Sequence, residues 1–216
     1  LITIDYGTQS VRALVFDGNG QLITKSMRPV IPYDVPELGW AEQDANYCWQ
    51  QVCEVLQQLW RESNITPSQI IGISLTTQRN CVIHLDREYR PLRPIIMWPD
   101  NRRAHKLPPF SPWWKMAFGV IGMTRRLNYF QGESECNWVV EHQPDVAEKT
   151  NKVGFLSAWL NYKLSGLLAD SVASQVGYLP FNYKKRMWGK PWAWQWEAID
   201  VTRNQMIDVI EPGEVL

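Results

Sequence analysis

Net charge, long apolar runs and cysteine are the features that this sequence lacks or has little of. Its 22 Lys and Arg residues balance 22 Asp and Glu residues, so the formal net charge is zero. A neutral chain is not attracted as a whole to nucleic acid or to an anionic membrane. No apolar run approaches the about 20 residues that cross a bilayer. The first residues carry no basic segment followed by a cleavage site, so we expect no signal peptide and a cytoplasmic location.

Cysteine and histidine are too few and too scattered to form a metal site. The four cysteines are Cys48, Cys53, Cys81 and Cys136, and no two of them form a C-x-x-C pair. The three histidines are His84, His105 and His142, and none is spaced as part of a triad or a zinc site. Buried free thiols in a chain without a secretory signal fit the cytoplasm.

The remaining composition is that of a globular protein. Hydrophobic residues make up 45% and charged residues 20% of the 216 residues, which is enough for one large domain with its own core. Tryptophan is abundant, with 12 residues. Large aromatic side chains pack cores more often than they form sugar-binding surfaces, and both uses stay open here.

The first part of the chain alternates in the manner of β-strands and then turns helical. Strands are predicted over Leu1–Asp5, Ser10–Phe16 and Gln21–Arg28, with a tight turn at Asp17–Gly20. Asp44 is a predicted N-cap of a helix that continues to about Arg61, because apolar residues recur there at helical spacing.

The rest of the chain mixes short strands with helices. Further strands are predicted at Ile70–Leu75, Cys81–Leu85 and Ile95–Trp98, and helices near Ser134–His142, Asp145–Lys149, Phe155–Leu164 and Thr202–Val209. A strand meander, a helix and further strands form the order of a ribonuclease-H-like unit, the building block of the actin and sugar-kinase superfamily. We therefore predict an α/β fold with a mixed sheet flanked by helices.

The segment Asp5–Ala13 carries the clearest chemical signal. An acid ends the first strand, a Gly-containing turn with hydroxyl and amide side chains follows, and Arg12 lies on the next strand. Such a turn can expose backbone N–H groups and hydroxyls to a phosphate, and the carboxylate can hold magnesium. A plain β-turn in which Asp and Ser cap the backbone is the alternative.

This segment resembles the first phosphate motif of the FGGY carbohydrate kinases, and the resemblance continues in order along the chain. The other similar segments are Gly39–Asp44, Ile71–Asn80, Pro94–Arg103, Leu160–Gly166 and Asp170–Ser174. The resemblance implies that residues 1–216 are the N-terminal domain of a kinase that phosphorylates a sugar or polyol with ATP and Mg²⁺. The rival identification as an acetate kinase or exopolyphosphatase is disfavoured by the segments 78–80 and 98–102.

The resemblance also implies roles for individual residues. Asp5 and Arg12 are expected to be catalytic, with Asp5 next to the metal. Contacts to the nucleotide phosphates are expected from Thr8, Gln9, Ser10 and Arg12. Contacts to the substrate are expected from Gln78, Arg79, Asn80, Trp98, Asp100, Arg102 and Tyr129. For Trp98 and Arg102 the alternative is core packing and a surface ion pair, and for Asp170 and Ser174 a helix cap and local packing are favoured.

The sequence departs from the family pattern in two ways. Asn80 stands where glycerol kinase carries Glu, and Pro99-Asp100 follows Trp98, so we expect a substrate other than glycerol. The G-x-x-D-x-x-A motif that supplies the general base is absent, as is the second, nucleotide-holding domain. The chain by itself is therefore expected to be inactive, and a non-catalytic carbohydrate-binding or sensor module is the alternative function. A homo-oligomer is left open.

Overall fold

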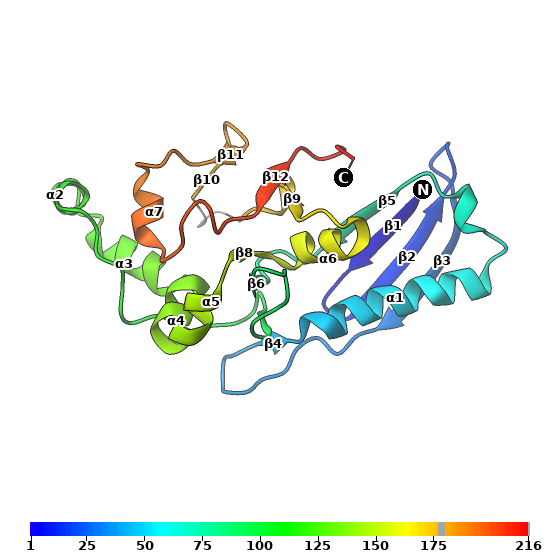
Figure 1. Cartoon of the computed structure of the whole chain (residues 1–216), viewed down its shortest axis with the longest axis horizontal. Coiled ribbons are helices and arrows are strands. Elements are labelled where there is room, and N and C mark those ends of the chain that lie inside the picture. The colour runs from blue at the N-terminus through cyan, green and yellow to red at the C-terminus, as the bar shows by residue number, and fades with distance from the viewer. Residues whose placement is uncertain (177–179, 216) are drawn as a thin grey trace.

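A computed structural model describes residues 1–176 and 180–215. The chain forms two four-stranded sheets that follow one another along the molecule, with most of the later helices at the far end from the first sheet (Figure 1). The first sheet has the order β3-β2-β1-β5, from the strands β1 (Ile2–Tyr6), β2 (Ser10–Phe16), β3 (Leu22–Pro29) and β5 (Ile73–Thr77). Strand β1 pairs antiparallel with β2 and parallel with β5, so the sheet is mixed.

Alternation along β1 and β2 sorts their side chains between a core face and an open face. The fully buried side chains are Ile2, Ile4, Tyr6, Val11, Ala13 and Val15. Because successive side chains of a strand point to opposite faces, Asp5 and Arg12 lie on the other face, and the register places them directly opposite each other. The strand pattern of the sequence therefore places the carboxylate of Asp5 and the guanidinium of Arg12 opposite each other on neighbouring strands.

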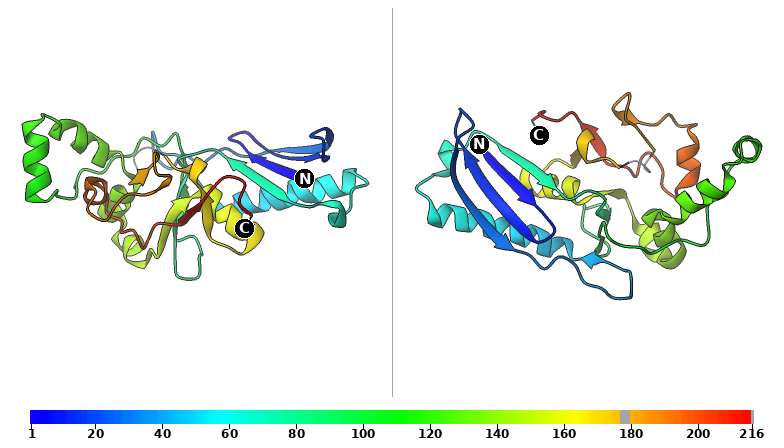
Figure 2. Two further views of the ribbon diagram at one scale, coloured as in Figure 1. Left: turned by 90° about the horizontal axis from the view of Figure 1, so that it is seen from above. Right: turned by 180° about the vertical axis from the view of Figure 1, so that it is seen from behind.

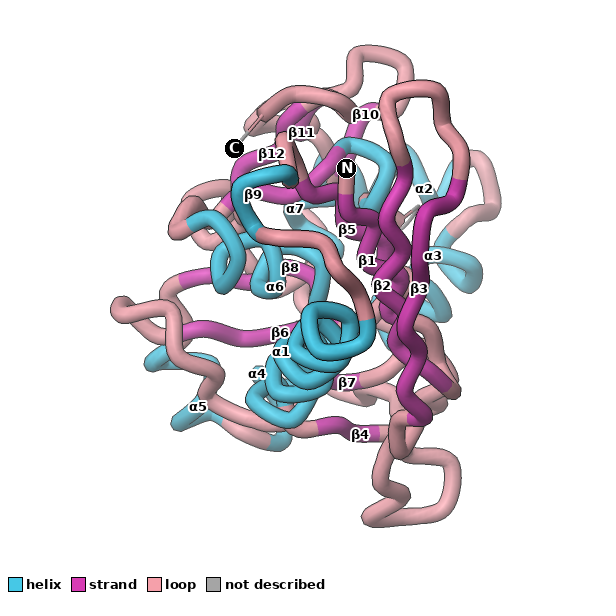
Figure 3. The backbone as a smooth tube through the Cα atoms, turned by 90° about the vertical axis from the view of Figure 1, so that its right-hand side faces the viewer, coloured by secondary structure: helices cyan, strands magenta, loops and turns pink. Residues whose placement is uncertain are grey.

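Two helices cover the core face of the first sheet. Helix α1 (Ala45–Glu62) packs on β2 and β3, and helix α6 (Leu156–Ser165) packs on β5. Figure 3 shows both helices on the same side of the sheet, and the view from above in Figure 2 shows α1 beneath the strands. Asp44 caps α1, because its carboxylate accepts a hydrogen bond of 2.9 Å from the backbone N–H of Tyr47.

The second sheet connects the first sheet to the helical end. Its order is β4-β7-β6-β8, from β4 (Glu42–Gln43), β7 (Ile95–Ile96), β6 (Val82–Leu85) and β8 (Lys152–Phe155). All three pairings are antiparallel. Every residue of β6 and β7 is buried, so short apolar strands hold the middle of the molecule together.

The helical end is held largely by aromatic side chains. Its helices are α2 (Pro112–Val120), α3 (Thr124–Gly132), α4 (Glu135–His142), α5 (Pro144–Lys149) and α7 (Trp194–Ala198). Trp194 packs against Phe110, Phe118 and Phe130, with ring centroids between 5.7 and 6.5 Å apart. These contacts tie α2, α3 and α7 together, since aromatic pairs at such distances stabilise beyond their buried area.

Short strand pairs and single turns of 3₁₀ helix complete the chain. They are β9 (Ala169–Ser171) with β12 (Asp208–Ile210), β10 (Phe181–Asn182) with β11 (Met187–Trp188), and the turns Pro67–Gln69 and Val172–Ser174. Within residues 1–176 and 180–215, no helix has the length and apolar character that a membrane span needs.

The predicted mixed α/β architecture is confirmed, while some element boundaries and one helix are wrong. The strand predicted at Ile70–Leu75 runs from Ile73 to Thr77, and the one predicted at Ile95–Trp98 ends at Ile96. The helix predicted over Thr202–Val209 is instead a turn followed by β12. There the side chain of Gln205 accepts a hydrogen bond from the backbone N–H of Thr202, and β12 pairs parallel with β9. Tertiary pairing thus overrides the helical spacing of the apolar residues.

Candidate active site

The turn between β1 and β2 is tight and is held by backbone contacts. The N–H of Gly7 donates to the carbonyl of Ser10 over 3.0 Å. A Cβ atom on Gly7 would lie 3.3 Å from that carbonyl oxygen, closer than most side chains tolerate. Ser10 is buried at the start of β2, whereas the side chain of Gln9 is exposed. The turn therefore keeps Thr8 and Gln9 at the end of the hairpin.

Asp5 and Arg12 form an ion pair on the open face of the first sheet. Arg12 Nη1 lies 2.8 Å from Asp5 Oδ2, and the two side chains are 48% and 34% exposed. Exposed pairs of this kind contribute at most about 1 kcal/mol to stability. Either partner can therefore exchange the other for a ligand at little cost.

The side chain of Thr8 joins three segments that are far apart in the sequence. Its hydroxyl donates to Gln78 Oε1 over 2.9 Å, and Trp98 Nε1 donates to the same hydroxyl oxygen over 3.4 Å. Gln78 follows β5, and its backbone N–H bonds to the carbonyl of Tyr6 over 3.2 Å, which extends the pairing of β1 with β5. The structure thus brings the predicted phosphate turn, the segment 78–80 and Trp98 together at one point.

The two residues after Gln78 turn the chain away from β5. Arg79 is exposed, and Asn80 adopts a positive φ of 59°. Asparagine tolerates this left-handed conformation better than most residues. Trp98 is 51% exposed, so one part of its ring is free to face a ligand while its N–H is held by Thr8.

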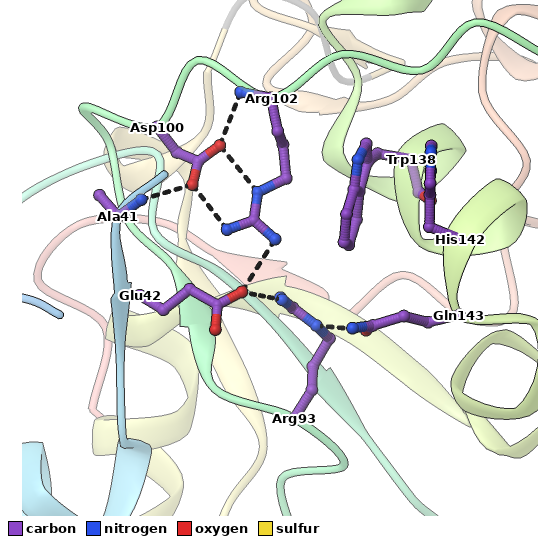
Figure 4. Close-up of polar contacts among 8 residues, drawn as sticks. All are labelled: Ala41, Glu42, Arg93, Asp100, Arg102, Trp138, His142 and Gln143. Atoms are coloured by element: carbon purple, nitrogen blue, oxygen red, sulfur yellow. Dashed lines mark hydrogen bonds and ion pairs between the residues drawn. The ribbon is translucent and has the colours of Figure 1, made fainter. Parts of the chain in front are cut away.

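Asp100 and Arg102 are bonded to each other inside the protein, so the alternative of a surface ion pair for Arg102 is wrong. Asp100 Oδ1 accepts hydrogen bonds from the backbone N–H and from Nε of Arg102, both over 2.8 Å, and Oδ2 accepts from Arg102 Nη2 over 2.7 Å and from the N–H of Ala41 over 2.6 Å (Figure 4). Their side chains are only 2% and 1% exposed. The polar groups of this pair point at the protein, and a direct contact with substrate stays a prediction.

Tyr129 lies on α3, outside the group around Thr8. Its ring is 57% exposed and lies beneath the guanidinium of Arg103, whose central carbon is 3.9 Å from the ring centroid. Within the described part of the chain, no hydrogen bond joins Tyr129 to Thr8 or Trp98. Its predicted role in substrate binding is not supported by proximity and stays a prediction.

Sequence reasoning missed the residues that surround Arg102. They are Trp40, Glu42, Arg93 and Trp138, and Gln143 in turn accepts a hydrogen bond from Arg93. Burial works against the charge of Arg102, but its hydrogen bonds and ion pair with Asp100 raise its pKa above the ordinary value. Burial lowers the pKa of Arg93 below its ordinary value, although the negative charge of Glu42 acts to raise it. Trp40 and Glu42 lie in the segment 39–44, which resembles the family pattern. The acid and the indole of that segment were the signal from which partners of Arg102 could have been predicted.

A magnesium ion would find one carboxylate at the turn. Among residues 1–176 and 180–215, no group of three Asp, Glu, His or Cys side chains is arranged to hold a metal. Magnesium in phosphate-transfer sites uses one or two carboxylates together with phosphate oxygens and water. The partly exposed Asp5 beside the turn fits that kind of site.

Comparison with known proteins identifies the family. The model of the FGGY family of carbohydrate kinases, N-terminal domain, matches residues 1–216. The chain belongs to the FGGY family. A glycerol kinase from Janthinobacterium sp. (strain Marseille) is 29% identical over 199 residues, which cover 87% of this chain and 39% of that relative. The FGGY chain therefore spans well under half the length of this relative.

Solved structures share the fold of the FGGY chain. A ligand-bound xylulose kinase from Lactobacillus acidophilus superposes with a TM-score of 0.75 at 19% identity, covering 100% of this chain and 42% of that one. A glycerol kinase from Plasmodium falciparum, solved with ADP, gives a TM-score of 0.72 at 17% identity, covering 96% and 42%. The predicted sugar-kinase fold is thereby confirmed.

Proposed function

We propose that a protein carrying this FGGY domain transfers the γ-phosphoryl group of ATP to a hydroxyl of a sugar or polyol. The observation that carries the proposal is the meeting of Gln78 and Trp98 on the hydroxyl of Thr8. The amide and the half-exposed indole offer a polar and an apolar contact to a sugar, at the tip of the turn proposed to bind phosphate. The names of the relatives supply the substrate class.

The Asp5–Arg12 pair suits the charge changes of phosphoryl transfer. When the phosphates of ATP arrive, Arg12 can exchange the Asp5 carboxylate for a phosphate oxygen, because their exposed ion pair is weak. That exchange frees Asp5 to bind a cation. Magnesium bound there would neutralise charge on the transferred group. Thr8, Gln9 and Ser10 are proposed to contact the phosphates from the turn itself.

Substrate selection is assigned to the segments after β5 and β7. Gln78, Arg79 and Asn80 would hydrogen-bond sugar hydroxyls, and Trp98 would cover an apolar face of the ring. Unmatched polar groups are costly in such a site, which is how it would discriminate between polyols. Asn80 in place of an acid favours a sugar over glycerol.

Two measurements test this proposal. Isothermal titration calorimetry of the 216-residue chain with xylulose and glycerol should detect binding that Gln78→Ala weakens at least about tenfold. Gln50→Ala, in an exposed part of α1, is the matched control and should bind as the wild type does. Equal affinity of the two variants for every sugar tested would contradict the assignment of the site.

The second measurement is ADP release coupled to sugar addition, made on a longer protein that contains this domain. Asp5→Asn should lower kcat about 10²- to 10³-fold, whereas Glu88→Gln, an exposed acid in a distant turn, should leave kcat unchanged. The 216-residue chain alone is expected to bind sugar without releasing ADP. A longer protein that binds sugar but releases no ADP would favour a binding module over a kinase.

A further inference from the structure

The side chain of Arg102 contacts two indoles and two carboxylates. Its guanidinium carbon lies 4.2 Å from the ring centroid of Trp40 and 4.5 Å from that of Trp138. Nη1 lies 2.8 Å from a carboxylate oxygen of Glu42, while Nε and Nη2 bond to Asp100. The two indole rings meet edge to face at 83°, so the guanidinium lies in the corner between them. The carboxylates lie beside it, as Figure 4 shows together with Trp138.

The charges around Arg102 balance inside the protein. Arg93 pairs with the same Glu42 carboxylate oxygen that Arg102 approaches. The side chains of Arg93, Arg102, Asp100 and Glu42 are between 1% and 13% exposed. Two cations thus face two anions with almost no access to water. Removal of one member would leave an uncompensated buried charge, which is strongly destabilising.

This buried group joins three parts of the fold. Glu42 belongs to β4, Asp100 and Arg102 lie in the segment after β7, and Trp138 lies on α4. Arg93 also donates from Nε to Gln143, between α4 and α5, over 2.7 Å. His142 stacks on the other side of Trp138, with ring centroids 4.8 Å apart. The segment after β7 is therefore anchored on both sides.

The segment after β7 that Arg102 anchors also contains Trp98, which belongs to the proposed substrate site. Asp100 donates its backbone N–H to the carbonyl of Met97 over 3.0 Å, which closes a turn around Trp98. The Asp100 carboxylate also holds the N–H of Ala41, immediately before β4. Trp98 leaves this turn to reach Thr8. Displacement of Asp100 would shift the base of that turn and with it the indole.

We propose that Arg102 is a positioning residue: packed in the corner between Trp40 and Trp138 and bound to Asp100, it sets the placement of the Trp98 indole over the Thr8 turn. That this placement affects substrate binding rests on the proposed function, whereas the placement of the Trp98 indole by Arg102 does not depend on it. Lysine cannot replace this arginine, because a single ammonium cannot bond Asp100 through two nitrogens while its charge also lies beside Glu42 and over the two indole rings. Arg102 acts through Trp98 and needs no contact of its own with substrate.

The test is ¹⁹F NMR of the chain labelled with 5-fluorotryptophan, with resonances assigned by single Trp→Phe replacements. In Arg102→Lys, the Trp98 resonance should move by more than its linewidth or split, while that of Trp159, in the core of the first sheet, should stay in place. Arg103→Lys is the matched control. The side chain of Arg103 is 35% exposed and pairs with Glu133 over 2.7 Å, so in this variant the Trp98 resonance should not move.

The outcomes separate the placement from the function. An unmoved Trp98 resonance in a folded Arg102→Lys variant overturns the proposal, whatever the variant does to sugar affinity. If Arg102→Lys does not fold, the same measurement is made on Trp138→Phe. This variant alters one of the two indole contacts of Arg102 without removing a charge. A shifted Trp98 resonance there supports the proposal, and an unshifted one overturns it. A shifted resonance in a protein that binds no sugar would sustain the positioning role and refute the proposed function.

Discussion

Replacement of the buried Asp170 by Asn should remove a specific pH dependence from the stability of the fold. Asp170 lies on β9 and is 1% exposed. Its carboxylate accepts hydrogen bonds from the hydroxyl of Ser157 over 2.9 Å and from the backbone N–H of Ser171 over 2.8 Å. These bonds favour the ionised form, but burial outweighs them and raises the pKa of Asp170 from 3.8 to about 6.

The sign and size of the effect follow from this shift. Because the folded pKa is raised, the folded state holds the proton more tightly than the unfolded state does between about pH 4 and pH 6. The stability present below the unfolded pKa is therefore lost as the pH rises through 6. A difference of about 2.2 pKa units corresponds to about 3 kcal/mol. Asparagine has a similar shape and does not titrate.

Urea denaturation followed by tryptophan fluorescence at pH 4 and pH 7.5 measures the effect. The free energy of unfolding of Asp170→Asn, relative to wild type, should increase by about 2 to 3 kcal/mol from the lower to the higher pH. All other groups titrate in both proteins and cancel. Asp208→Asn, an exposed acid on the paired strand β12, is the control and should change by less than about 0.5 kcal/mol. A relative stability of Asp170→Asn that is the same at both pH values would refute the reasoning.

Three further predictions concern other parts of the fold. Gly154→Ala should lower the free energy of unfolding by about 1 to 3 kcal/mol, because the new Cβ would lie 2.3 Å from Ile207 Cδ1. Gly119→Ala, with open space around it in α2, should raise it by up to about 1 kcal/mol; equal effects in urea denaturation would contradict both. Asp44→Ala should cost about 1 kcal/mol in thermal denaturation by loss of the α1 cap, and Asp44→Asn only a few tenths; a similar loss in both would argue against the cap. Burial and a nearby arginine lower the pKa of His84 to about 3, so the unfolded state takes up its proton first and stability falls as the pH drops below 6.5. His84→Gln should remove about 2 to 3 kcal/mol of that fall between pH 7.5 and pH 4.5 in urea denaturation; an unchanged slope would refute the assignment to His84.

The part of the fold that sequence predicted is the part that local patterns control. Alternating side chains determine which faces of β1 and β2 are buried, and that alternation alone put Asp5 and Arg12 on the open face. Asp44 was recognisable as a cap because capping involves residues three positions apart. The family resemblance was likewise carried by short segments whose order and spacing a single sequence displays.

Contacts between distant residues were beyond such patterns. The hydroxyl of Thr8 meets the indole of Trp98 across 90 positions, and Arg102, after β7, pairs with Glu42 on the neighbouring strand β4. The sequence suggested that Arg102 was a substrate ligand or a surface ion pair, whereas packing buries it against two perpendicular indoles. In the segment 202–209, pairing with β9 replaced the predicted helix. Periodicity determines which face of an element is apolar, but only the assembled core decides which partners a polar side chain finds, because that choice depends on what surrounds it once water is excluded.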